Sequence, residues 1–256
     1  MGSEGLSELL FEIASDERLQ MLEAVAERPL RHAEIARRLK MTGSETTRHL
    51  NRLTAAGLVE RNGRGEYEPT QLARALRLGL PFFEFLVDHR AYLLTHQVRI
   101  LEPPFVERLG ELGRATFVEG TYRVVAVQES ALREVARRIW VVTEQRFEQA
   151  LPILREKADH GGDVRVIRPR PHLEEEKRTG PEVRRNFPVK ALAAVNLFLA
   201  VLDDQAGLCL PTLDGKIDMG TMILVRDPEG CRWAEDLFSH LWSRADDWRI
   251  PAPGVR

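Results

Sequence analysis

Hydrophobic residues recur at helical spacing through the first quarter of the chain. The segment 17–27 carries an apolar stripe, follows Asp16, a residue type that caps helix N-termini, and is closely followed by Pro29. The segment 31–40 carries a second stripe of the same period. The pattern therefore predicts two consecutive amphipathic helices, of which the first is capped by Asp16 and ends before Pro29.

A third helix is predicted to begin after a short turn at residues 41–43. Thr42 and Glu45 stand in the T-x-x-E arrangement of a capping box, and Gly57 favours a helix end near Ala56. On a helical wheel one side of this helix is suited to packing and carries Thr46, Leu50, Leu53 and Gly57. The opposite side is polar and carries Ser44, Glu45, Arg48 and Arg52, flanked by Thr47 and Asn51. This outward face has the donors and acceptors that base edges and phosphates require.

The segment 58–70 alternates around a glycine-rich tip and predicts two short strands joined by a tight turn. Helix, turn, helix and basic hairpin, in this order, are the elements of a winged helix-turn-helix. We expect Arg48 and Arg52 to contact bases or phosphates, with further contacts near the N-terminus of the same helix. Arg61 and Arg64, near the hairpin turn, are expected to reach phosphate or the minor groove.

The net charge of −2 hides an uneven distribution. Residues 28–64 contain nine basic and three acidic side chains, a balance of +6, so the rest of the chain carries −8. A charge run is usually a solvated face, and an arginine-rich outer face is common on amphipathic helices. Here the run coincides with the predicted recognition helix and hairpin, which favours nucleic acid as its partner.

Two further helices are predicted after the hairpin, one capped by Thr70 and one starting at Pro81. The second contains many large apolar side chains within 81–100, which is unusual for a solvated linker. Burial against the C-terminal domain and packing against a partner subunit both explain this composition. Pro103 and Pro104 then break the pattern and mark a candidate boundary.

The remainder of the chain alternates short apolar strands with helices, as an α/β unit does. Strands are predicted at 122–128, 139–144, 163–169, 193–204, 206–211 and 221–227. Helices are predicted at 131–138, 147–160 and 230–248. About six strands are therefore expected on one mixed sheet.

The stretch "EIARRLKMTGSETTRHLNRLTAAGLVERNGRGEYEPT" resembles the winged-helix domain of the ArsR type found in prokaryotic transcription regulators. The resemblance implies double-stranded DNA as a partner and a homodimer. Metal-sensing members carry clusters of Cys or His ligands, whereas residues 1–100 here contain no Cys and only four scattered His. No metal site is therefore expected.

The stretch from about Pro104 to Trp248 resembles the C-terminal domain of archaeal regulators related to the methanogenesis and filament-growth regulator. The likeness is carried by Ile139–Val142, Gly162–Ile167, Glu182–Arg184, Pro188, Leu202–Asp204, Leu210–Pro211, Asp214–Gly215 and the motif Trp233-x-x-Asp236-Leu237-Phe238-x-x-Leu241-Trp242. More distantly, it is similar to sugar-responsive regulators of the TrmB type, whose phospholipase D-like domain holds a small effector without catalysis. The resemblance implies an effector-sensing domain here.

The sequence contains no recognisable catalytic constellation. It lacks GxSxG, P-loop, GxGxxG and H-x-K-x4-D motifs, and Cys209 and Cys231 are in no CxxC spacing. We therefore expect no catalytic residues, no cofactor and no enzyme activity. A phosphodiesterase of the phospholipase D superfamily and a winged-helix protein-interaction module are the alternatives.

Basic residues gather where the predicted strand 163–169 ends, and open α/β sheets bind ligands at such ends. Candidate effector contacts are Arg168, Arg170, His172, Arg184, Arg185, Asp203 and Lys216, with Lys177, Arg178 and Asp218 as further candidates. An arginine-rich lip suits an anionic effector such as a carboxylate or phosphate.

Taken together, these patterns predict an α+β protein with three parts. Residues 1–75 form the winged helix-turn-helix, 76–103 a helical connector, and 104–256 a non-catalytic α/β domain with a mixed, phospholipase D-like sheet. No apolar run approaches the roughly 20 residues of a membrane span and the N-terminus is unlike a signal peptide, so a cytoplasmic location is expected.

Overall fold

A computed structural model describes residues 3–135, 137–145, 150–179 and 186–248. The chain divides into two compact units, Met1–Leu80 and Pro81–Arg256, and each is described by itself. None of the helices within the described ranges is long and apolar enough to span a membrane. The chain is an α+β protein, as its sequence predicts.

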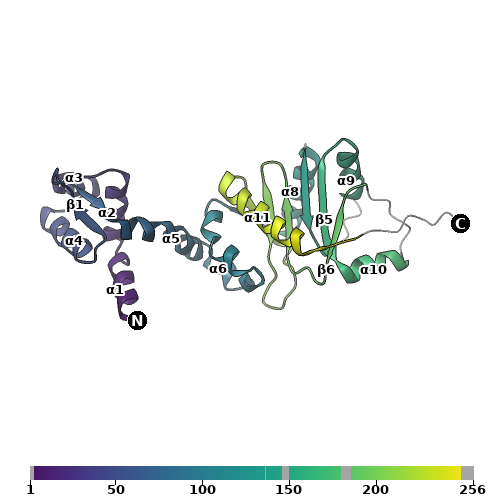
Figure 1. The fold of residues 1–256 in the computed structure, drawn as a ribbon, viewed down its shortest axis with the longest axis horizontal. Helices are drawn as coiled ribbons and strands as arrows, with labels where there is room; N and C mark the ends of the chain where they lie inside the picture. The colour runs from purple at the N-terminus through teal and green to yellow at the C-terminus, as the bar shows by residue number, and fades with distance from the viewer. Residues whose placement is uncertain (1–2, 136, 146–149, 180–185, 249–256) are drawn as a thin grey trace. The chain divides into compact units, whose positions relative to one another are not determined.

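The first unit is a winged helix-turn-helix (Figure 1). Its elements are α1 (Ser3–Ile13), α2 (Asp16–Glu27), α3 (His32–Leu39), α4 (Gly43–Ala55), β1 (Val59–Arg61), β2 (Tyr67–Pro69) and the start of α5 (Gln71–Asp88). The strands pair antiparallel, with Val59 opposite Pro69 and Arg61 opposite Tyr67. Met21, Leu22 and Ile35 are fully buried in the core of this unit, as the predicted apolar stripes require.

At the start of the chain one prediction was wrong and one helix was not predicted. The cap of α2 is Ser15, whose Oγ accepts a hydrogen bond from Arg18 N at 3.4 Å, and Asp16 lies in the first turn. Both residue types favour helix starts, so sequence spacing alone did not separate two neighbours. The helix α1 was missed, although its apolar residues also recur at helical spacing.

The helix α5 continues through Pro81, which was wrongly predicted to start a new helix. Thr70 does cap it, since its Oγ1 accepts from Ala73 N at 3.2 Å. A proline inside a helix removes one backbone hydrogen bond. Beyond it, Phe85 of the same helix is fully buried. Phe85, Tyr92 and Leu101 belong to the buried core of the second unit, which accounts for part of the apolar composition of 81–100.

The second unit is built on a mixed sheet whose described strands run in the order β10-β6-β5-β4-β7-β8-β9-β3. The strands are β3 (Thr116–Glu119), β4 (Arg138–Val142), β5 (Asp163–Pro169), β6 (Val189–Leu192), β7 (Phe198–Val201), β8 (Ala206–Cys209), β9 (Thr221–Val225) and β10 (Asp246–Asp247). The pairs β4–β5 and β5–β6 are parallel, and the remaining pairs are antiparallel.

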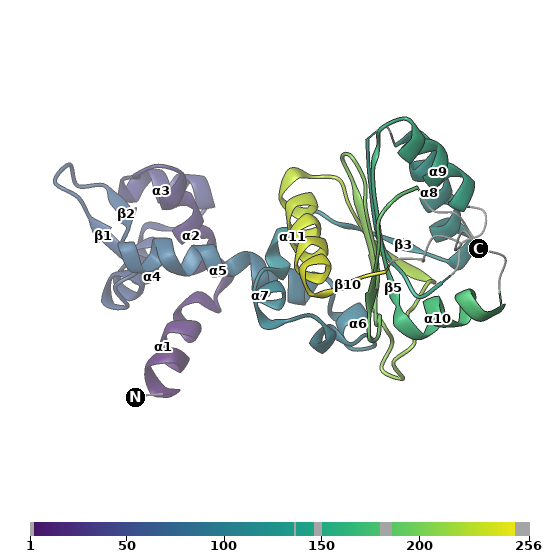
Figure 2. The same ribbon diagram turned by 45° about the vertical axis from the view of Figure 1, so that its right-hand side comes forward.

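Helices cover both faces of this sheet (Figure 2). The face that carries α11 (Pro228–Arg244) also receives α6 (Arg90–Leu93), α7 (Pro103–Val106) and two short 3₁₀ turns, Val98–Ile100 and Leu109–Leu112. Trp233 and Phe238 of α11 are buried in one continuous apolar cluster on that face. The other face carries α8 (Thr121–Glu134), α9 (Ala150–Asp159) and α10 (Arg170–Thr179).

The predicted strand 122–128 was wrong, because α8 covers this segment, and the predicted helix 131–138 is the last turn of α8, which ends at Glu134. Val124 and Ala131 are buried at helical spacing, so the helical stripe outweighs the β-branched run that suggested a strand. The strands β3, β6 and β10 were not predicted. Residues 170–179, which sequence left as a charged segment after a strand, form the helix α10.

Candidate functional sites

The helix α4 begins at a complete capping box. Thr42 Oγ1 accepts from Glu45 N at 3.2 Å, and the Glu45 carboxylate accepts from Thr42 N at 2.9 Å. Donation to this carboxylate from Thr42 N, and from the Thr42 hydroxyl at 2.7 Å, holds the pKa of Glu45 below its usual range. The predicted cap is therefore confirmed, and it engages a carboxylate that was also predicted to contact DNA.

The inward side of α4 is buried as the wheel predicted, with Thr46, Leu50 and Leu53 at 1% exposure or less. His49 is also buried, which the wheel analysis missed although position 49 neighbours that side. Burial, followed by the charge of Arg48, lowers the pKa of His49. The helix thus packs on a neutral imidazole beside its exposed basic face.

The outward side of α4 presents polar groups to solvent. Its exposed residues are Ser44, Glu45, Thr47, Arg48 and Asn51. The Thr47 hydroxyl donates to Gly43 O and lies 2.9 Å from His32 Nε2. Arg48 has a single side-chain contact among the described residues, 3.3 Å from His49 Nε2, so its guanidinium remains available to a ligand.

Arg52 is held by α1 instead of standing free. Its Nε and Nη2 donate to the two carboxylate oxygens of Glu12 at 3.0 and 2.5 Å, and its guanidinium lies 5.1 Å from the ring centre of Phe11. Arg18 contacts the same end of α1, since it donates to Phe11 O at 2.6 Å and pairs with Glu12. The Arg52 contact lowers the pKa of Glu12. Sequence missed this pair because its partners are 40 positions apart.

The wing is a tight hairpin. Asn62 Oδ1 accepts from the backbone N of Arg64 and Glu66 at 3.0 and 3.1 Å, and Gly65 takes a positive φ of 76° that glycine adopts without strain. Arg61 is anchored, since its Nε donates to Gly65 O at 3.2 Å. The Arg64 side chain is exposed and makes no ion pair with the described residues, so it is the freest cation of the wing.

A cavity of about 410 Å³ lies in the second unit between the sheet and the helices α8 and α9. The helices contribute Val125, Ala131, Leu132, Leu151 and Leu154, and the strands contribute Val141, Val166, Phe198, Ala200 and Met222. Its volume is within the range of small-molecule sites, about 300–1,000 Å³. Its volume and its largely apolar walls make it the candidate ligand site.

Among the predicted effector contacts that the structure describes, only Arg168 lines this cavity. Arg170 pairs with Asp246, His172 Nδ1 lies 3.0 Å from Glu144 O, and Asp203 accepts from the backbone N of Arg137 and Arg138. Arg184 and Arg185 lie outside the described residues. His172, Asp203 and Lys216 are exposed, so most of the described set lies on the surface outside the cavity, which sequence spacing alone does not show.

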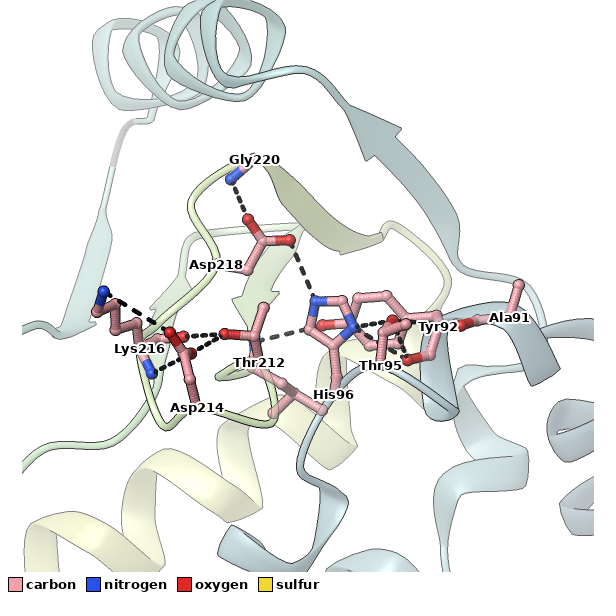
Figure 3. Close-up of polar contacts among 10 residues, drawn as sticks. Ala91, Tyr92, Thr95, His96, Thr212, Asp214, Lys216, Asp218 and Gly220 are labelled. Atoms are coloured by element: carbon pink, nitrogen blue, oxygen red, sulfur yellow. Dashed lines mark hydrogen bonds and ion pairs between the residues drawn. The ribbon is translucent and has the colours of Figure 1, made fainter.

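Lys216 lies in an exposed turn and pairs with Asp214 at 3.7 Å (Figure 3). Beside it, His96 Nε2 lies 3.1 Å from Asp218 Oδ2, and the His96 ring stacks on Tyr92 with centres 3.7 Å apart. Burial raises the pKa of Tyr92. This cluster ties the residues after α6 to the β8–β9 loop.

The two cysteines have the properties of structural thiols. Burial raises the pKa of Cys209 to about 12 and that of Cys231 to about 11. Both therefore remain protonated at neutral pH, where a thiol is a weak nucleophile.

Both units match known protein families. Residues 15–61 match the bacterial regulatory protein, arsR family, and residues 121–244 match the middle domain of the methanogenesis regulatory protein FilR1. No curated protein matches the chain. The chain is therefore a DNA-binding transcriptional regulator, in which one segment is similar to the arsR family and another to the FilR1 middle domain.

Solved structures show weaker similarity. TrmBL2, an archaeal chromatin protein whose structure shows a novel mode of DNA binding, is 15% identical with a TM-score of 0.40, covering 96% of this chain and 100% of that one. NucT from Helicobacter pylori is 11% identical with a TM-score of 0.38, covering 52% and 98%. HmgR from Pseudomonas aeruginosa is 16% identical with a TM-score of 0.28, covering 90% and 96%. The class of the protein rests on the two family matches.

Proposed function

We propose that this regulator binds a specific DNA site as a homodimer, with α4 in the major groove and the β1–β2 wing on the flanking backbone. The observation that carries the proposal is the polar outer face of α4, exposed next to a basic wing within a segment of charge +6. Base edges require such donors and acceptors, and phosphates require such cations.

The contacts are proposed to differ between the arginines. No carboxylate among the described residues forms an ion pair with Arg48 or Arg64, so each can contact DNA without first breaking an ion pair. Arg52 must exchange Glu12 for its DNA contact, and the energy of that exchange reduces its net contribution. Glu45 and Arg61 support the helix cap and the wing turn as well as lying on the proposed surface.

Dimer formation has support from α1. Leu6, Leu10 and Phe11 are large apolar side chains that the single chain leaves exposed there, and contiguous apolar surface commonly marks an interface. A two-fold dimer would bind a pseudo-palindromic site with half-site centres about one helical turn apart, or a multiple of it.

The second unit is proposed to sense a small molecule in the cavity under α8 and α9, without catalysing a reaction. An effector of this kind acts by binding one arrangement of the dimer better than another. Phosphodiesterase activity that is lost in His172→Ala would overturn the non-catalytic assignment.

Selection and sequencing of bound genomic fragments tests the proposal, with and without a pool of cellular metabolites. Enrichment of a near-symmetric motif is the expected result, and a shift in enrichment with metabolites would support sensing. Retention that is salt-sensitive but unselective would instead indicate an architectural role, and no retention at low salt would indicate a protein-binding winged helix. Light scattering on the same sample measures the oligomeric state.

A further inference from the structure

The two faces of the sheet in the second unit are packed differently. The face under α11 is covered by one continuous cluster of buried apolar side chains. The opposite face carries two separate clusters, one that includes Ala131 and Val166 and another that includes Phe198 and Met222. All four of these residues line the 410 Å³ cavity, which therefore lies between the two clusters, as does Val141, which packs against both.

A cavity of this size weakens a core. Protein interiors are packed about as densely as organic crystals, and each unfilled volume removes contacts from the side chains around it. A ligand that fills the space would restore these contacts and join the two clusters. The cavity thus has the character of a binding site that is completed by its ligand.

The described lining is mainly apolar. Nineteen of its 26 residues are apolar or glycine, and the polar remainder is Gln128, Glu129, Arg133, Thr143, Gln145, Arg168 and Gln205. Glu129 and Arg133 have opposite charges and are exposed, so they belong to the rim. Most of a bound molecule would therefore contact hydrocarbon.

Arg168 is the buried cation of the described lining, with 7% exposure. Its Nη1 pairs with Glu176 at 2.5 Å and its Nη2 donates to Glu144 O at 3.3 Å. Its Nε is buried and has no partner among the described residues. The charge of Arg168 is thus compensated, while one of its donors is unused.

We propose that the cavity binds a neutral, largely apolar small molecule with one hydrogen-bond acceptor, such as a carbonyl, for Arg168. A carboxylate would also approach the negative charge of Glu176, and burying it without its own counter-charge is costly. This inference rests on the proposed sensing function, and it replaces the anionic ligand expected from the arginine-rich sequence by a neutral one.

The test uses the full chain and a neutral fluorescent probe, N-phenyl-1-naphthylamine, which emits strongly in apolar surroundings. We expect saturable fluorescence with the wild type. Competition with 2-nonanone and with nonanoate compares a carbonyl and a carboxylate on similar chains. The ketone should displace the probe at a concentration at least about tenfold lower than nonanoate does, because a desolvation cost of about 1.4 kcal/mol for the carboxylate corresponds to a factor of ten.

Two variants fill the cavity from different elements. Val125→Trp adds an indole from α8, at a position with 38% exposure that tolerates a large side chain, and Ala200→Phe adds a ring from β7. Each should weaken probe binding by about tenfold or more. The matched control is Tyr122→Trp, which places an indole on α8 at a residue that is 94% exposed and outside the cavity. It should bind the probe like the wild type.

Retention of DNA, measured on the same preparations, distinguishes failure of the ligand site from failure of the proposed regulatory function. Absence of saturable probe binding, or unchanged binding in both filled variants that still retain DNA, would overturn the cavity as a ligand site. Stronger displacement by nonanoate than by the ketone would overturn the neutral ligand class. Probe binding without any DNA retention would contradict the proposed regulatory function and leave the ligand site intact.

Discussion

Replacement of Arg64 by Ala should change the salt dependence of DNA binding in a calculable way. The guanidinium lies at the wing tip, exposed and without an ion pair among the described residues. A cation in this state that meets a phosphate releases about 0.9 of a counterion on binding. The slope of log K against log salt should therefore become shallower by about 0.9 for each half-site occupied.

The same value predicts how the difference in affinity changes with salt. Between 50 and 200 mM salt, a slope change of about 0.9 lowers the ratio of wild-type to variant affinity by about 3.5-fold for one half-site. The wild type and Arg64→Ala should thus differ most at low salt and converge as salt increases. The loss should be similar for an operator fragment and for unrelated DNA, because a phosphate contact carries no sequence information.

The assay is a fluorescence anisotropy titration of operator and unrelated DNA over a salt series. Arg74→Ala is the matched control, since Arg74 is also exposed and lies on α5, outside the proposed surface. It should leave the slope unchanged. A loss confined to the operator with an unchanged slope would show that Arg64 reads bases, and the reasoning from its free charge would then be wrong.

Three further predictions concern the winged helix. Glu12→Gln should strengthen DNA binding, because it releases Arg52 from its ion pair; weaker binding would show that the pair serves to position Arg52. Thr42→Ala should lower the free energy of unfolding, measured by urea denaturation, by about 1 kcal/mol because it removes the α4 cap. Thr54→Ala, on the exposed side of α4, should leave the free energy of unfolding unchanged. Burial lowers the pKa of His49, so the stability that the neutral imidazole contributes should be complete above about pH 6.5 and should be lost as the pH falls below that value. Thermal melts over this pH range measure the effect, and a His49→Gln variant that keeps the full pH dependence would contradict it.

The sequence predicted the recognition elements well because their signals are local. Thr42 and Glu45 interact within one turn of helix, and the stripe that buries Leu50 and Leu53 repeats within the same helix. The wing turn likewise depends on residues only a few positions apart, such as Asn62 and Glu66. Such contacts form whenever the local backbone forms, so periodicity and residue type reveal them.

Only the tertiary structure decided the features that depend on residues distant in sequence. The β-branched run in α8 is compatible with a strand until Val124 and Ala131 pack on the sheet. Arg52 appears free on a helical wheel, yet α1 brings Glu12 to it. The apolar cavity forms between elements spread from α8 to β9, so its lining cannot be assembled from spacing, and charge alone pointed to an anionic ligand. Local interactions determine the elements, whereas the partners of a charge and the volume between layers depend on how those elements pack.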